Sequence, residues 1–136
     1  MSKARPAGRP PRRARRQPPS PLIGPWRITE MELWEPDALD LVGPAQITLE
    51  QGGRGHMNFI AVELLLDCQI ARRDGRDGIE FTFEGSDEGD RVSGHGWAVL
   101  EGQTLRGRID FHQSDNSGFV ARRLTSPRRT RREQRR

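Results

Sequence analysis

The chain has 136 residues, a length that fits a single domain. Only 32% of the residues are hydrophobic, and the one cysteine, Cys68, excludes an intrachain disulfide. No apolar run approaches the ~18 residues of a membrane helix, and the N-terminal region has no apolar run of signal-peptide length. These features exclude a membrane-spanning helix and predict a cytoplasmic protein.

The basic charge is confined to the two ends of the chain. Residues 1–23 contain seven Lys or Arg and no acid, and residues 125–136 contain six Arg and one Glu. Residues 24–124 contain ten Arg and eighteen Asp or Glu, a net charge of −8. Segments as rich in Arg and as poor in apolar residues as the two ends cannot bury enough surface to fold. We therefore predict disordered basic tails over 1–23 and 125–136 and one acidic domain over 24–124.

The predicted domain begins with the stretch GPWRITEMELW, residues 24–34, whose β-branched and aromatic residues favour a strand. Ile28, Glu30 and Glu32 share one parity of this strand, while Met31 has the other parity. If both carboxylates faced inward, the pKa of one would rise and a reactive site would become plausible. A bulge between Ile28 and Met31 would instead place both carboxylates outside, and we favour this bulge.

Seven further strand-like segments follow a break at residues 35–44, where Asp37 is placed to cap a single helical turn. Turns rich in Gly and Asp separate most of these segments. The strands are expected at residues 45–50, 56–63, 64–70, 79–84, 91–100, 104–112 and 118–124. Many short strands and no long helix predict an all-β fold, either an antiparallel up-and-down β-barrel or a barrel-like sandwich of about eight strands.

The pairing of the segments 91–100 and 104–112 can be estimated from the turn between them. A three-residue turn over 101–103 pairs Leu100 with Thr104 and directs the more apolar face of both strands inward. A polar His95 on that face needs a hydrogen-bond partner, as a core histidine or as the polar group of an apolar ligand pocket. The candidate ligand-binding residues on the inner face are His95, Trp97, Phe111 and Phe119.

The segments W-x-I-x-E-M-E-x-W, GPAQI, EFTFEGSDEGD and GHGWAVLEGQTLRGRIDFHQSDNSGFVAR, within residues 24–123, resemble a family of small bacterial proteins of unknown function. The start Gly24-Pro25-Trp26 is also similar, more loosely, to lipocalin-like (calycin) barrels. In those barrels, Gly-X-Trp opens the first strand and an Arg of the last strand packs across the Trp ring. The resemblance implies that Trp26 closes one end of the barrel and that Arg123, or else Arg122, lies over its ring. A ligand site would then lie at the opposite end.

Patterns typical of metal binding or catalysis are missing from the sequence. The three histidines His56, His95 and His112 lack the spacing of a zinc site. The acidic stretch GSDEGD does not follow the calcium-loop pattern, and no serine lies in a Gly-X-Ser-X-Gly elbow. The leucines around Cys68 predict an inert, buried thiol. We therefore expect a protein that is not an enzyme and that uses no metal or cofactor.

Two functions remain after these exclusions. The first is a non-catalytic binding module in which the barrel binds a small apolar ligand or a protein partner. The alternative is a nucleic-acid-associated protein that binds without sequence specificity through its tails, with an affinity that falls as salt rises. The acidic domain would repel phosphate, so this binding is assigned to tail arginines: Arg12, Arg13, Arg15, Arg16, Arg128, Arg129, Arg131 and Arg132.

Overall fold

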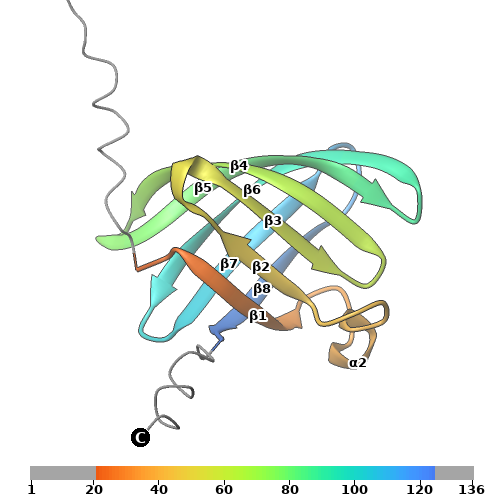
Figure 1. The fold of residues 1–136 in the computed structure, drawn as a ribbon, viewed down its shortest axis with the longest axis horizontal. Helices are drawn as coiled ribbons and strands as arrows, with labels where there is room; N and C mark the ends of the chain where they lie inside the picture. Colours follow the sequence, from red (N-terminus) through yellow and green to blue (C-terminus); the bar gives the residue numbers. More distant parts are fainter. Residues whose placement is uncertain (1–20, 125–136) are drawn as a thin grey trace, which may run out of the picture.

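A computed structural model describes residues 21–124, which form a closed antiparallel β-barrel. Each strand pairs with the next along the chain, and β8 pairs with β1 to close the barrel (Figure 1). The strands are β1 Gly24–Met31, β2 Gln46–Leu49, β3 Arg54–Phe59, β4 Val62–Arg73, β5 Arg76–Asp87, β6 Asp90–Glu101, β7 Thr104–Phe111 and β8 Asn116–Arg123. The up-and-down barrel predicted from the sequence is confirmed, and the sandwich alternative is wrong.

The connections between strands fall alternately at the two ends of the barrel. One end, named here the Trp26 end, has the start of β1, the end of β8 and the β4–β5 and β6–β7 turns. The other, the α2 end, has the helical turn α2 (Pro36–Leu39) and the β3–β4, β5–β6 and β7–β8 turns (Figure 1). At the β4–β5 turn, Asp74 and Gly75 have φ angles of 51° and 76°, as expected for an Asp-Gly hairpin turn.

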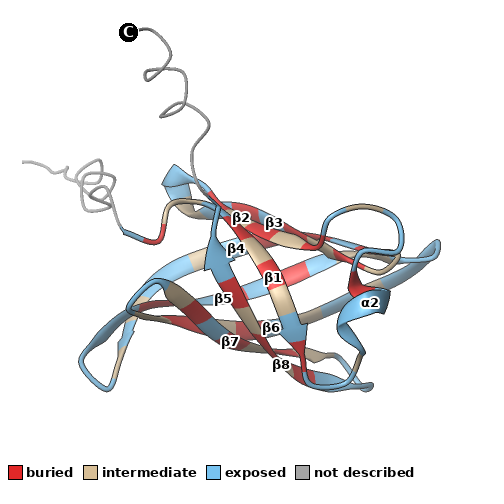
Figure 2. Ribbon diagram, turned by 90° about the horizontal axis from the view of Figure 1, so that it is seen from below, coloured by how far each residue is buried: buried red, intermediate tan, exposed pale blue. Residues whose placement is uncertain are grey.

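Side chains fill the interior of the barrel. Buried and exposed residues alternate along the strands (Figure 2), because successive side chains of a strand point to opposite faces. Glycines inside the wall make room for aromatic rings: a Cβ atom on Gly96 would lie 2.6 Å from Cζ of Phe81, and one on Gly107 would lie 2.6 Å from Cζ of Phe119. The largest fully buried side chains include Trp26, Phe59, Phe119, Leu22, Ile28, Leu39, Ile47, Met57, Leu105 and Ile109.

The expected bulge in β1 is confirmed. The pairing of β1 with β8 shifts by one residue between Ile28 and Glu30. A bulge inserts one extra residue into a strand. Even-numbered residues such as Ile28 therefore face inward before the bulge, and the odd-numbered Met31 is buried after it. Glu30 and Glu32 are therefore exposed on the outer face.

The predicted register of β6 and β7 is wrong by one residue. The turn contains only Gly102 and Gln103, so Leu100 pairs with Leu105 and Glu101 with Thr104. A slip of one residue moves every side chain of one strand to the other face. Gly96 and Ala98 therefore face inward on β6, and His95 and Trp97 lie on the outer wall.

Two local predictions are also wrong. The segments 56–63 and 64–70 are divided at Ile60-Ala61 instead, where Ile60 adopts a φ of 56° and donates its N–H to the Leu39 carbonyl at 2.7 Å. No Gly, Pro, Asn or Asp marks this turn in the sequence. In α2, Pro36 occupies the first turn and the capping position is Glu35, without a side-chain bond. Asp37 is therefore a first-turn residue and not the cap.

The packed domain begins before the predicted boundary at Gly24. Leu22 is only 2% exposed and belongs to the hydrophobic core, and its carbonyl accepts the indole N–H of Trp26 at 3.0 Å. Assigning all of residues 1–23 to a tail is therefore wrong at Leu22. Within residues 21–124, no helix combines the length and the apolarity needed to cross a membrane.

Candidate ligand-binding pocket

Trp26 closes one end of the barrel. Its side chain is fully buried, and its backbone pairs with Ile47 of β2 and Arg123 of β8. The Cζ atom of Arg123 lies 4.2 Å from the centre of the Trp26 ring, so the predicted contact is confirmed and the arginine is Arg123. The same guanidinium donates hydrogen bonds to the carbonyls of Ile23, at 3.2 Å, and Pro21. The arginine thus joins the indole to the start of the domain.

The α2 end has a pocket of about 300 Å³. Four apolar residues line it: Trp34 follows β1, Val62 begins β4, Val92 lies on β6 and Phe111 ends β7. Six polar residues complete the lining: Asp87 ends β5, Arg91 and Ser93 lie on β6, and His112, Ser114 and Asp115 lie in the β7–β8 connection. We call this site the α2-end pocket. Its lining combines an apolar surface with charged groups of both signs.

Contacts with the core hold the two pocket aromatics. The ring of Trp34 lies 5.4 Å from the ring of Phe59, which is fully buried. The ring of Phe111 meets Phe83 edge-on at 5.2 Å, a geometry that aromatic pairs favour. Trp34 and Phe111 are themselves only partly buried. Each ring therefore has one side in the core and surface left to meet a ligand.

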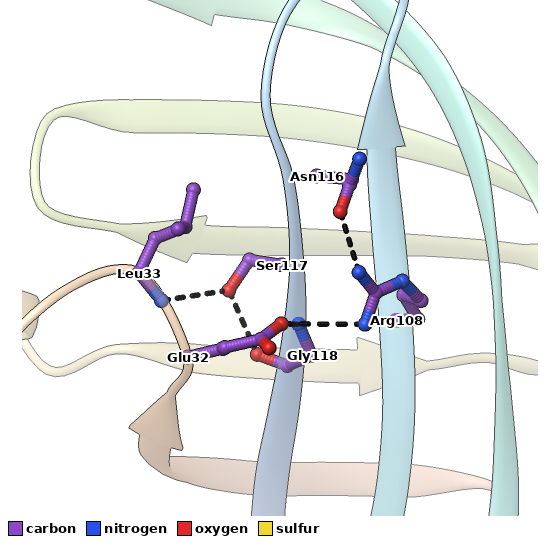
Figure 3. Close-up of polar contacts among 6 residues, drawn as sticks. All are labelled: Glu32, Leu33, Arg108, Asn116, Ser117 and Gly118. Atoms are coloured by element: carbon purple, nitrogen blue, oxygen red, sulfur yellow. Dashed lines mark hydrogen bonds and ion pairs between the residues drawn. The ribbon is translucent and has the colours of Figure 1, made fainter.

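Polar contacts attach Glu32 and Leu33, the two residues before Trp34, to β8 (Figure 3). The Leu33 N–H donates to Oγ of Ser117 at 3.2 Å, and that hydroxyl donates to the Gly118 carbonyl at 2.9 Å. One carboxylate oxygen of Glu32 accepts from the Gly118 N–H at 3.1 Å and from the Arg108 guanidinium at 3.3 Å. Because these bonds attach residues 32 and 33 to β8, the next residue, Trp34, is directed to the mouth of the barrel.

The four predicted ligand-binding residues do not form one site. Phe111 lines the α2-end pocket, whereas Phe119 is buried in the core, with only 2% of its surface exposed. His95 and Trp97 lie together on the outer wall, where His95 faces Asp110 at 3.4 Å. Phe111 is the only residue of this pocket among the four predicted, and the aromatic pocket residue that the sequence reasoning missed is Trp34. Its signal was the bulge, which returns Met31 to the interior and carries the chain towards the barrel mouth.

Metal binding finds no support in the part of the chain that the structure describes. Across residues 21–124, no group of three or more His, Cys, Asp or Glu side chains is placed to hold an ion. His56 and His95 each lie near a single carboxylate, Glu50 at 3.8 Å and Asp110 at 3.4 Å. One carboxylate orients a histidine but leaves a metal site without enough ligands.

Cys68 is expected to react slowly with thiol reagents. Burial raises the pKa of its thiol from the ordinary value of 9.0 to about 12, and the nearby Asp67 carboxylate adds to the increase. At pH 8 the thiolate fraction is then about 10³-fold lower than for an unperturbed thiol, and the rate of alkylation by iodoacetamide should fall in proportion. A time course followed by mass spectrometry, with free cysteine as the control, measures this. Alkylation as fast as that of free cysteine would show that the thiol is accessible.

The same shift predicts how stability depends on pH. The folded protein holds the proton of Cys68 more tightly than the unfolded chain does, so this contribution to stability is fully present below pH 9. It declines as the pH rises from about 9 towards about 12, because only the unfolded chain loses the proton in that range.

The predicted nucleic-acid-binding arginines, residues 12, 13, 15, 16, 128, 129, 131 and 132, lie outside the described residues. That assignment therefore stays a prediction. Comparison of the chain with protein-family models, curated proteins and solved structures found no match.

Proposed function

We propose that this protein is a non-catalytic binding module that holds a small, largely apolar ligand in the α2-end pocket. The observation that supports this proposal is the difference between the two ends of the barrel. The Trp26 end is closed by a fully buried indole under Arg123. The α2 end keeps a pocket of about 300 Å³ lined by partly buried Trp34, Val92 and Phe111.

The size and lining of the pocket define the class of ligand. A volume of about 300 Å³ is at the lower limit of ligand pockets in proteins, so the ligand is compact. The apolar side chains favour an aromatic or branched aliphatic body, and Arg91, His112 and the rim carboxylates favour a single polar end. Because Phe59 and Phe83 fill the barrel beneath the pocket, the ligand would lie at the mouth and not deep in the interior.

The Trp26–Arg123 contact supports a lipocalin-like character for this module. Such barrels pack an arginine of the last strand across the first-strand Trp, and Arg123 occupies that place here. The proposal therefore extends the likeness from the closed end of the barrel to ligand binding at the open end.

The test is a titration of the full chain with the apolar fluorescent probe N-phenyl-1-naphthylamine, with and without a substitution that fills the pocket. Val92→Phe adds a ring to the pocket lining, and we expect it to weaken probe binding about tenfold or more, equivalent to about 1.4 kcal/mol. The matched control is Val120→Phe, the same change on β8 at a residue outside this pocket. It should leave binding unchanged.

Two results would contradict the proposal. One is the absence of saturable probe binding to the folded parent chain. The other is an equal loss of binding in both valine variants, which would assign the probe to another surface. Thermal unfolding of both variants shows whether each remains folded at the temperature of the titration.

A further inference from the structure

We infer that the outer wall of the barrel has a second binding site, which takes the arginine-rich segment 128–132 of the same chain. The site is a groove of about 390 Å³ across β4 to β7, named here the outer groove. Its side chains include Asp67, Arg73, Glu80, His95, Trp97 and Asp110. None of these residues lines the α2-end pocket, so this inference is independent of the proposed function.

Strand pairing assembles the outer groove. Asp67, Thr82, His95 and Asp110 pair in one row across β4, β5, β6 and β7. In the neighbouring row, Glu80 of β5 pairs with Trp97 of β6. Residues of one row stand side by side on the same face of a sheet. Three carboxylates therefore lie around a single outward-facing indole.

The indole already accepts a guanidinium. The Cζ atom of Arg73, at the end of β4, lies 4.1 Å from the centre of the Trp97 ring. Arg73 forms no ion pair with another residue in the range 21–124, and its buried Nε lacks a hydrogen-bond partner there. A cation over an indole is stabilised by the negative face of the ring. Arg73 thus occupies one face of the indole, and further arginines would bind at the carboxylates that surround it.

The carboxylates of the groove leave negative charge uncompensated. Asp67 and Glu80 form no hydrogen bond or ion pair through their side chains with any other described residue, and Asp110 meets only His95. The segment 128–132 contributes four arginines and no acid, and residues 24–124 have a net charge of −8. Charge complementarity therefore favours an arginine-rich occupant.

The length of the chain fits this occupant. β8 ends at Arg123. Trp97 of β6 pairs with Arg108 of β7, which pairs with Gly118 of β8. Leu124 is therefore separated from Trp97 by six residues along β8, from Gly118 to Leu124, and by two strands across the sheet. At about 3.3 Å per residue along a strand and about 4.8 Å between strands, the separation is about 22 Å. An extended chain spans about 3.3–3.6 Å per residue, so about seven residues bring Arg131 and Arg132 to the outer groove.

The N-terminal arginines are the natural comparison. They precede β1, which lies three strands from β6 in the barrel, whereas β8 lies two strands away. Replacing Arg12, Arg13, Arg15 and Arg16 by Gln removes the same charge as replacing Arg128, Arg129, Arg131 and Arg132 by Gln. The two quadruple variants therefore separate a specific contact from a general effect of tail charge.

The experiment observes the indole N–H resonances of the full chain by ¹H–¹⁵N NMR at low ionic strength. Trp97→Phe assigns the Trp97 signal, and Trp26, whose indole N–H is bonded to Leu22 inside the barrel, is the internal reference. We expect the Trp97 resonance to move in the C-terminal quadruple variant and to stay in place in the N-terminal one. Raising the salt concentration of the parent chain should move it in the same direction, because salt screens exposed charges.

A second pair of substitutions tests the outer groove itself. In the full chain, Asp67→Asn with Glu80→Gln should move the Trp97 resonance as the C-terminal variant does, and adding the C-terminal changes should then have no further effect. The inference is overturned if the C-terminal variant leaves Trp97 unmoved, or if the N-terminal variant moves it equally. It is also overturned if the shift depends on protein concentration, because the occupant would then belong to a second copy of the chain.

Discussion

Trp26→Ala is expected to lower the free energy of unfolding by about 3–5 kcal/mol, the range for removing a large buried aromatic side chain. The indole is fully buried, donates to the Leu22 carbonyl and lies under Arg123. Its loss opens the closed end of the barrel and removes the indole N–H that donates to this carbonyl. Since about 1 kcal/mol corresponds to roughly 4–8 °C in a domain of this size, the midpoint of thermal unfolding should fall by more than about 12 °C.

Trp97→Ala is the matched control for this substitution. It removes the same side chain from the outer wall, where the ring is only partly buried, and should cost about 1 kcal/mol. Arg123→Ala should cost about 0.5–1 kcal/mol, the range for an exposed cation–π pair. If Trp26→Ala unfolds near the parent temperature, or no lower than Trp97→Ala, then Trp26 does not close the barrel.

Leu22→Ala is expected to destabilise the domain by about 2–5 kcal/mol, as for a leucine removed from a core. Leu22 is 2% exposed although it precedes the first strand. Truncation at Cβ leaves a cavity next to Trp26, because the surrounding side chains relax only partly. Urea unfolding of the full-length variant, followed by circular dichroism, measures the loss.

Leu65→Ala is the control for this prediction, because the same chemical change is made at a leucine that is 68% exposed on β4. It should change the free energy of unfolding by no more than about 0.5 kcal/mol. If the Leu22 and Leu65 variants are equally stable, Leu22 does not contribute to the core and the domain begins at Gly24, as the sequence predicted.

Strand alternation could be read from the sequence because it is a local property. In the segment 79–84, Phe81 and Phe83 have the opposite parity to Glu80 and Glu84, and the structure buries the two phenylalanines. The β1 bulge could be predicted for the same reason, since Met31 has the wrong parity to face inward with Ile28 on a regular strand. These predictions use only the side-chain period of two.

The candidate site could not be predicted to the same degree. The faces of β6 depend on whether its turn has three residues or two, and a difference of one residue exchanges them. Between Gly94 and Ala98, the odd-numbered residues His95 and Trp97 have large side chains, and the even-numbered residues are Gly or Ala. The hydrophobic pattern therefore predicted that the face with Trp97 points inward, which is wrong. The space available inside the barrel decides which face of β6 points inward. The rings of Phe81 and Phe83, which belong to β5, occupy the volume next to Gly96 and Gly94 and leave no room there for a larger side chain.

The sequence by itself determined the eight-stranded antiparallel class, the bulge in β1 and the acidic domain between basic ends, because alternation, turn residues and charge are local or additive properties. Only the tertiary structure decided that His95 and Trp97 face outward, that Leu22 enters the core and that Trp34 meets Phe111 at one pocket. Each of these depends on how side chains from distant strands share the volume of a closed barrel. That volume is a property of the assembled sheet and of no single segment.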